Sequence, residues 1–204
     1  MAKELNELEV MAVRILQRRS KQILMYNPDF GNIPVADLVE STFDGGLDYS
    51  ITREICRFAG KDDKSMLDDY VDNQLKFKKD SREMMGKFLQ ENRSVVDKTI
   101  AEIAGSDKYP YCCLYTAVRK DDPYAKDNVK DLTEQLVTYT AAKVMLKELD
   151  KAGVLKKGKY INISDKKAMK VFYDTVNGLA EKAEKNVSLK KPIGNIVKFN
   201  GMEK

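Results

Sequence analysis

The chain has 204 residues, of which 43% are hydrophobic and 33% charged, with a formal net charge of +4 and no histidine. The hydrophobic share argues against a disordered chain. The missing histidine excludes Ser–His and Cys–His nucleophile pairs and imidazole metal sites. No run approaches the ~18 consecutive apolar residues that cross a bilayer, so we expect no membrane association. The polar, acidic N-terminus lacks the apolar core of a secretory signal, which predicts a cytoplasmic protein or one inside an intracellularly assembled particle.

The charge is unevenly distributed along the chain. Residues 151–204 contain 13 lysines and five acidic residues, a balance of +8, which leaves −4 for residues 1–150. A basic C-terminal quarter on a mildly acidic body predicts an acidic partner, either protein or nucleic acid.

Apolar residues at helical spacing predict helices along the first half of the chain. Residues 3–25 are expected to form an amphipathic helix with one apolar face, made of Leu5, Leu8, Ala12, Ile15 and Leu16. A loop over 27–34, a short helix over 35–43 and a second short helix capped by Ser50 follow.

From residue 64 to 104 the pattern predicts two or three consecutive helices, with one long helix as the alternative. Asp80 and Glu83 have the spacing of a capping pair that starts a new helix, and Ser94 with Asp97 could start another.

The second half of the chain is predicted to be helical around one small β-hairpin. Asp127 caps a long helix that closes at Gly153, and Ser164 caps the last helix. Between them, Val154-Leu155 and 160–163 form a hairpin around a basic turn. The fold class is therefore mainly α, with six to eight helices, one small β-hairpin and an extended C-terminal tail.

Three regions follow from these elements. We expect an N-terminal helical region over 1–105, a C-terminal helical region with the hairpin over 106–186, and an extended tail over 187–204. A single domain over 1–186 followed by the tail is the alternative.

Motifs of nucleotide binding and Ser–Lys catalysis are incomplete. The segment 153–159 fits most of a phosphate-binding loop, but Tyr160 stands where a Ser or Thr should bind magnesium, and the expected strand-then-helix context is missing. The segments 164–167 and 188–191 match Ser-x-x-Lys without the partner elements of that chemistry. We therefore predict no catalytic residue and no cofactor.

Metal binding is not expected either. Cys112-Cys113 with one further cysteine and no histidine leave too few soft ligands for zinc. The aspartates near residue 65 lack the spacing of a calcium loop and are better explained as helix-start residues; they are Asp62, Asp63, Asp68, Asp69 and Asp72.

Two segments are candidate interaction sites. In the first, Arg14, Arg18 and Lys21 share a helix face, and together with Arg19 they could contact phosphates; a solvated or salt-bridged helix surface is the alternative.

The second candidate is the tail. It is too short and too interrupted to form its own core, so its apolar residues need a surface to cover them; they are Ile193, Ile196, Val197 and Phe199. Packing onto its own chain, or a loose terminus, is the alternative.

The leading functional hypothesis is a non-enzymatic structural or assembly subunit that binds copies of itself or other protein subunits, as in a virion or another multi-subunit assembly. The alternative is a nucleic-acid-binding protein that uses the basic helix 14–21 or the basic C-terminal quarter. An enzyme that uses carboxylates, Lys or Tyr ranks third, because no constellation of such residues can be named.

Overall fold

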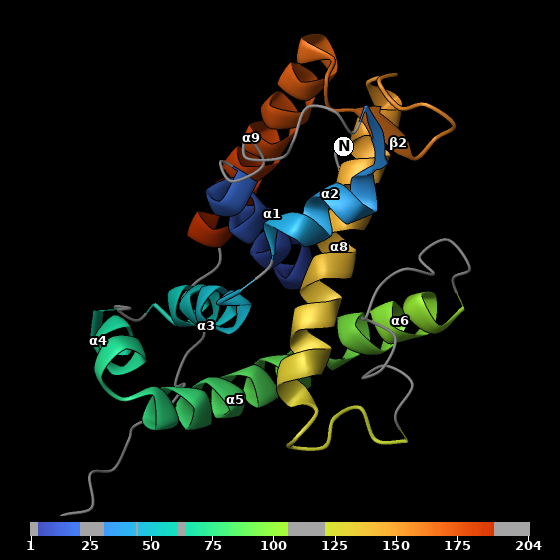
Figure 1. The fold of residues 1–204 in the computed structure, drawn as a ribbon. Helices are drawn as coiled ribbons and strands as arrows, with labels where there is room; N and C mark the ends of the chain where they lie inside the picture. The colour runs from blue at the N-terminus through green and yellow to red at the C-terminus, as the bar shows by residue number, and fades with distance from the viewer. Residues whose placement is uncertain (1–3, 21–30, 44, 61–63, 106–120, 190–204) are drawn as a thin grey trace, which may run out of the picture.

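The computed structural model describes residues 4–20, 31–43, 45–60, 64–105 and 121–189. Within these residues the chain forms eight helices and two short strands, and the expected mainly α fold is confirmed (Figure 1). In chain order the elements are α1 (Glu7–Arg19), β1 (Asn32–Pro34), α2 (Val35–Thr42), α3 (Leu47–Phe58), α4 (Lys64–Asp72), α5 (Gln74–Glu91), α6 (Arg93–Ala104), α8 (Val129–Lys151), β2 (Tyr160–Asn162) and α9 (Lys166–Leu189).

Helices α1 and α8 form the centre of the molecule. Helix α1 buries Leu8 and every residue from 10 to 16, and α8 buries more than half of its 23 residues. Helix α1 packs against both α8 and α9, while α2, α3, α5 and α6 pack against α8 (Figure 1). The prediction of a single apolar face on the first helix was too narrow, because Val10 and Val13 are also covered.

Local capping contacts set where helices begin. Asn6 and Glu9 form a reciprocal capping box at α1, in which each side chain accepts from the other residue's backbone N–H at 2.9 Å. At α9 the capping side chain is Asp165, which accepts from the backbone N–H of Lys167 at 2.8 Å, rather than the expected Ser164.

Residues 64–104 form three helices, α4, α5 and α6, which agrees with the prediction of two or three consecutive helices and not with one long helix. The first break falls at Asn73, whose side chain accepts from the backbone N–H of Lys76 at 3.2 Å. The predicted helix start at Asp80 and Glu83 is wrong, since α5 runs through both positions. On the surface of α5 each carboxylate forms an ion pair with a lysine four residues away: Asp80 with Lys76, and Glu83 with Lys87.

The two strands join distant parts of the chain. Strand β2 pairs antiparallel with β1, with Ile33 opposite Ile161, so the segment expected as a loop over 27–34 provides the partner strand. On its other side β2 makes an isolated bridge from Tyr160 to Lys156, across a turn in which Gly158 has a φ of +67°. The predicted turn is therefore present, while the main partner of the strand lies about 130 residues away.

Helix α9 ends beside the start of α1. It runs to Leu189 and so includes the first three residues of the expected tail, and Asn186 Nδ2 donates to the backbone oxygen of Leu5 at 3.4 Å. One core cluster contains residues from both sides of residue 105. No helix among the described residues is both long and apolar enough to cross a bilayer.

Candidate functional site

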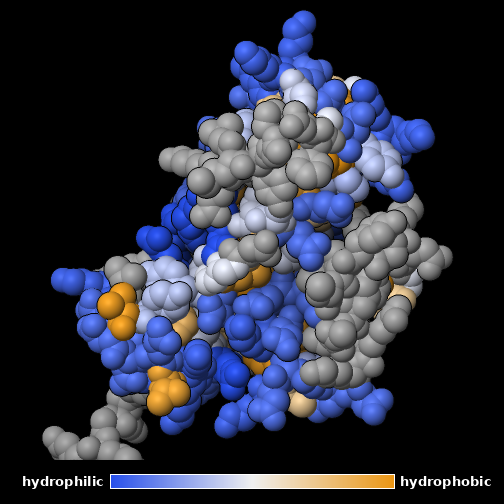
Figure 2. All heavy atoms as spheres, in the orientation of Figure 1, coloured by the Kyte–Doolittle hydropathy of each residue, from blue (hydrophilic) through white to orange (hydrophobic). Residues whose placement is uncertain are grey.

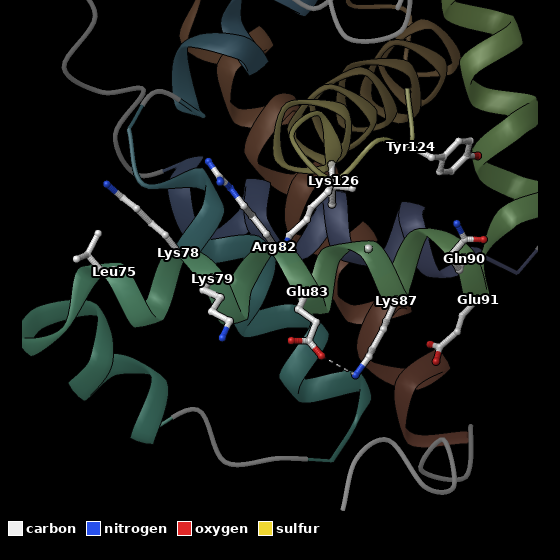
Figure 3. A pocket seen from close by; sticks show the side chains of 12 residues that line it. Leu75, Lys78, Lys79, Arg82, Glu83, Lys87, Gln90, Glu91, Tyr124 and Lys126 are labelled. Atoms are coloured by element: carbon white, nitrogen blue, oxygen red, sulfur yellow. Dashed lines mark ion pairs between the residues drawn. The ribbon is translucent and has the colours of Figure 1, made fainter. Parts of the chain in front are cut away.

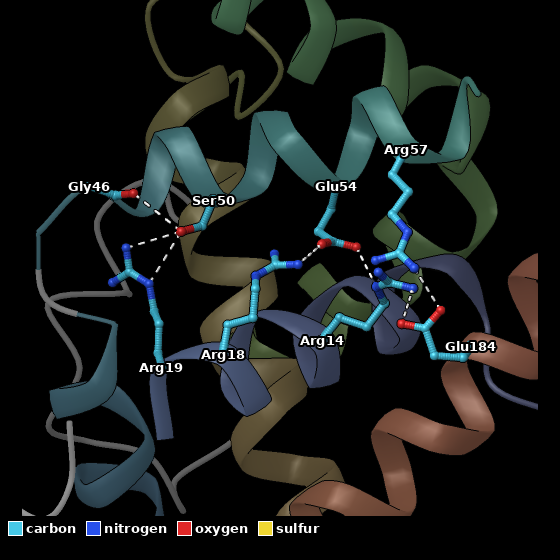
Figure 4. A network of polar contacts seen from close by, with 8 residues as sticks. All are labelled: Arg14, Arg18, Arg19, Gly46, Ser50, Glu54, Arg57 and Glu184. Atoms are coloured by element: carbon cyan, nitrogen blue, oxygen red, sulfur yellow. Dashed lines mark hydrogen bonds and ion pairs between the residues drawn. The ribbon is translucent and has the colours of Figure 1, made fainter. Parts of the chain in front are cut away.

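The basic cluster of α1 lies against other helices. The Arg14 side chain is 3% exposed; its Nε lies 2.7 Å from Glu54 Oε2 on α3, and its Nη1 lies 2.9 Å from Glu184 Oε1 on α9 (Figure 4). Arg18 reaches the other oxygen of Glu54, which is 1% exposed, and Arg57 meets Glu184 at 2.7 Å. These ion pairs hold α1, α3 and α9 together, and they occupy the groups that were expected to face phosphates.

Arg19 also binds within the fold. Its Nη2 donates to the backbone oxygen of Gly45 at 2.8 Å and to Ser50 Oγ at 3.1 Å, at the corner between α2 and α3. Burial, followed by the charge of Arg18, lowers the pKa of the guanidinium below its ordinary value. Lys21, the fourth residue of the cluster, lies outside the described residues.

The other sequence candidates are dispersed. The turn over 153–159 is preceded by α8 and followed by β2, the context that argues against a phosphate-binding loop. Asp68, Asp69 and Asp72 lie on α4, and no three acidic or cysteine side chains in the described part of the chain are placed to hold a metal ion. The tail candidates, Ile193, Ile196, Val197 and Phe199, lie outside the described residues.

A groove along the outward face of α5 is a feature that the sequence did not predict. It has a volume of about 940 Å³, and α5 forms one wall while the segment before α8 forms the other (Figure 3). The lining residues are Leu75, Lys78, Lys79, Arg82, Glu83, Gly86, Lys87, Gln90, Glu91, Tyr124, Lys126 and Val129.

The sequence of α5 explains why this face is open. Phe77, Met85, Phe88 and Leu89 turn inward, so residues four apart form two ridges on the opposite side. One ridge runs 75, 79, 83, 87, 91 and the other runs 78, 82, 86, 90. Gly86 interrupts the second ridge, and a Cβ added there would lie 4.0 Å from Val129 on the far wall. At Gly86 the backbone of α5 therefore faces the far wall with no side chain between them.

The far wall is held by contacts to α6. The Tyr124 hydroxyl donates to Asp97, and the Arg93 guanidinium lies 3.9 Å from the Tyr124 ring centroid. Burial and the bond to Asp97 raise the pKa of Tyr124 well above its ordinary value. The same hydrogen bond is the main cause of the lowered pKa of Asp97. The phenol therefore acts as a hydrogen-bond donor that ties the far wall to α6.

The groove is basic. Five cations and two carboxylates line it, and Lys87 pairs with Glu83 at 3.2 Å. Across the described residues no carboxylate pairs with the remaining cations, which are Lys78, Lys79, Arg82 and Lys126. Lysine and arginine stems supply apolar surface below their charged ends, so such a groove suits an acidic partner with an apolar side.

Exposed apolar side chains mark the end of the groove. Leu75 is 82% exposed and Val71, on the neighbouring helix α4, is 68% exposed. Apolar surface is visible at the corner where α4 meets α5 (Figure 2). The sequence predicts helix here, but it does not mark this face as an exposed surface.

We compared the chain with models of known protein families, with curated proteins and with solved structures, and none of the three comparisons finds a match.

Proposed function

We propose that the protein is a non-enzymatic assembly subunit that docks a protein partner through the groove along α5. The observation that carries this proposal is the groove itself, which combines an exposed leucine at one end with cations that have no carboxylate partner among the described residues. Exposed apolar side chains next to unpaired charges are typical of protein-binding surfaces.

The chemistry of the groove favours recognition over bond-making. Its polar groups are mainly lysine, arginine and glutamate side chains at the surface, and Tyr124 is committed to Asp97. Enzyme pockets instead place a few polar groups so that they converge on one point within a mostly apolar cavity. An open wall with ridges of charged side chains along a helix fits a helix or an extended segment better than a small molecule.

The C-terminal tail remains part of the proposal. Helix α9 extends to Leu189, and we propose that the apolar residues beyond it bind a neighbouring subunit. The groove and the tail would then give each subunit two separate contacts.

A nucleic-acid-binding role is the second candidate, and the cations of the groove are what favours it. Lys78, Lys79, Arg82 and Lys126 replace the α1 arginines as the residues that such binding would use. Binding that falls steeply as salt is raised, and that is lost when Lys78 and Arg82 are changed to glutamate, would favour this alternative over a protein partner.

The test of this proposal uses substitutions at Gly86, the groove position that has no side chain. In an extract of its source cells, the natural protein is expected to run well above the mass of a single 23.2 kDa chain, together with partner chains in fixed proportion. Gly86→Phe would place a bulky side chain in the groove, and it is expected to remove from the complex the partner that binds there.

Gly86→Ala is the matched control, because its methyl group makes only ordinary contact with Val129 and leaves the groove open. If the wild-type protein runs as a single chain, the proposal is wrong. If the Gly86→Phe complex keeps every chain of the wild-type complex, the proposed use of the groove is wrong.

A further inference from the structure

The corner between α4 and α5 carries charges of opposite sign on its two arms. Asp68 and Asp72 are exposed on α4, whereas Lys78, Lys79 and Arg82 are exposed on α5. Val71 and Leu75 are the exposed large apolar residues of the described chain, and they lie between these two sets, at the end of one helix and the start of the next. Along the corner the surface is therefore acidic, apolar and then basic.

Helix α4 packs on the rest of the chain through its opposite side, so the surface with Asp68 and Asp72 faces solvent. The Tyr70 ring lies 4.9 Å from the Tyr49 ring and 5.0 Å from the Phe77 ring, between centroids, which fixes the inner side of α4. Each residue turns a helix by about 100°, so Asp68 and Asp72, two positions from Tyr70 on either side, lie nearly opposite to it. Asp69 is held separately, through its ion pair with Lys76.

We propose that this corner is the contact surface for a second copy of the chain, related by a two-fold axis through Val71 and Leu75. An acidic–apolar–basic surface becomes complementary to itself when it is turned by 180°, because the acidic arm of one copy then meets the basic arm of the other. The α4 carboxylates of each copy contact Lys78, Lys79 and Arg82 of its partner, and the exposed apolar residues pack at the axis. This inference rests on the proposed function and names one partner of the groove, at its Leu75 end.

Charge favours a second copy over the two longest segments of this chain that lie outside the described residues. By sequence, residues 106–120 carry a net charge of +2 and residues 190–204 a net charge of +3. A basic segment placed along the unpaired cations of α5 would be repelled. The α4 arm brings two unpaired carboxylates and an exposed valine, which match the basic arm in both charge and apolar character.

The symmetry provides a test based on charge reversal. Asp68→Lys with Asp72→Lys makes both arms basic, and Lys78→Glu with Arg82→Glu makes both arms acidic. In either variant the two contacts of a two-fold dimer become repulsive, so we expect self-association to weaken at least tenfold, or about 1.4 kcal/mol. In an equimolar mixture each contact again joins opposite charges, and we expect a heterodimer of near wild-type strength.

Sedimentation velocity and native mass spectrometry of the full-length proteins, at concentrations up to about 1 mM, measure these outcomes. All four changed residues are exposed, so thermal unfolding is expected to be unaltered. Asp174→Lys, in an exposed ion pair on α9, is the control and is expected to leave the dimer intact.

A wild-type chain that stays monomeric over this range would overturn the inference, as would variants whose mixture fails to associate. Assemblies larger than a dimer would indicate a head-to-tail contact in place of a two-fold one, and they would also overturn the inference. None of these results decides the proposed function, because Gly86→Phe tests the groove in the native complex whatever the partner is.

Discussion

The two basic regions of this protein contrast in what their charges contact. On α1, Arg14 and Arg18 converge on Glu54, whose side chain is 1% exposed, so these charges are neutralised inside the fold. On α5, Lys78, Lys79 and Arg82 point to solvent from a helix whose other face is buried. Clusters of similar composition therefore serve opposite purposes: one fixes the packing of three helices, and the other leaves charge available to a partner.

The largest expected effect comes from breaking the buried cluster. Glu54→Ala removes the carboxylate between two arginines and leaves Arg14 buried beside Glu184 alone, which should cost about 3–5 kcal/mol of unfolding free energy. Urea unfolding measures this loss. Glu184→Ala is the control, because its side chain is 51% exposed and its loss should cost about 1 kcal/mol or less. Equal losses from the two changes would mean that burial does not distinguish these carboxylates.

The two faces of α5 provide the next comparison. Met85→Ala removes a fully buried side chain and should cost about 2–5 kcal/mol, whereas Leu75→Ala should change stability by about 0.5 kcal/mol or less. Thermal and urea unfolding of both variants measure the difference. A large loss from Leu75→Ala would show that this side chain packs on the folded chain and is not free for a partner.

Gly86→Ala should stabilise the protein by about 0.5–1 kcal/mol. The position lies inside α5, where glycine is a poor helix former, and the added methyl meets Val129 at an ordinary contact distance. An increase in the unfolding midpoint without a change in the denaturant slope is the expected result. A lower unfolding midpoint would indicate that the added methyl group clashes with Val129.

The smallest effect concerns Glu134 on α8. Burial raises the pKa of this carboxyl above its ordinary value of 4.5, despite the nearby Lys130, so the folded protein holds the proton more tightly than the unfolded chain does. Its contribution to stability is therefore lost as pH rises from 4.5 through the raised value. Glu134→Gln should give a modest gain in stability at pH 7.

The same gain should disappear below pH 4.5, where the wild-type carboxyl is also neutral in both states. Unfolding free energies of the two proteins across this pH range test the sign. If Glu134→Gln raises the unfolding free energy by the same amount at every pH, burial of the Glu134 charge is not the cause of the gain.

Much of the helix content was predictable because helical periodicity and capping are local. The long helix before Gly153, the last helix and the presence of more than one helix over 64–104 follow from spacing within about ten residues. The break at Asn73 was missed in favour of Asp80, since both residues can cap, and the choice depended on Phe77 packing inward.

Features that depend on distant residues were not predictable. The partner of β2 lies about 130 residues earlier, and Glu54 lies 40 residues from Arg14. The apolar residues Val10 and Val13, on the side of α1 away from Ile15, were the available signal that this helix is covered all round. The α5 ridges were visible in the sequence as a four-residue repeat, but nothing local indicates that Tyr124 and Lys126 form the facing wall.

The burial of α1 on every side also constrains how the chain is made. Helix α1 is synthesised before the other described helices, yet the helices that cover it, α8 and α9, end at Lys151 and Leu189. At about 5–20 residues per second, the growing chain carries an uncovered apolar helix for roughly 10–30 s. A chain terminated before α9 never completes the covering, so prematurely ended products should aggregate while full-length chains stay in solution.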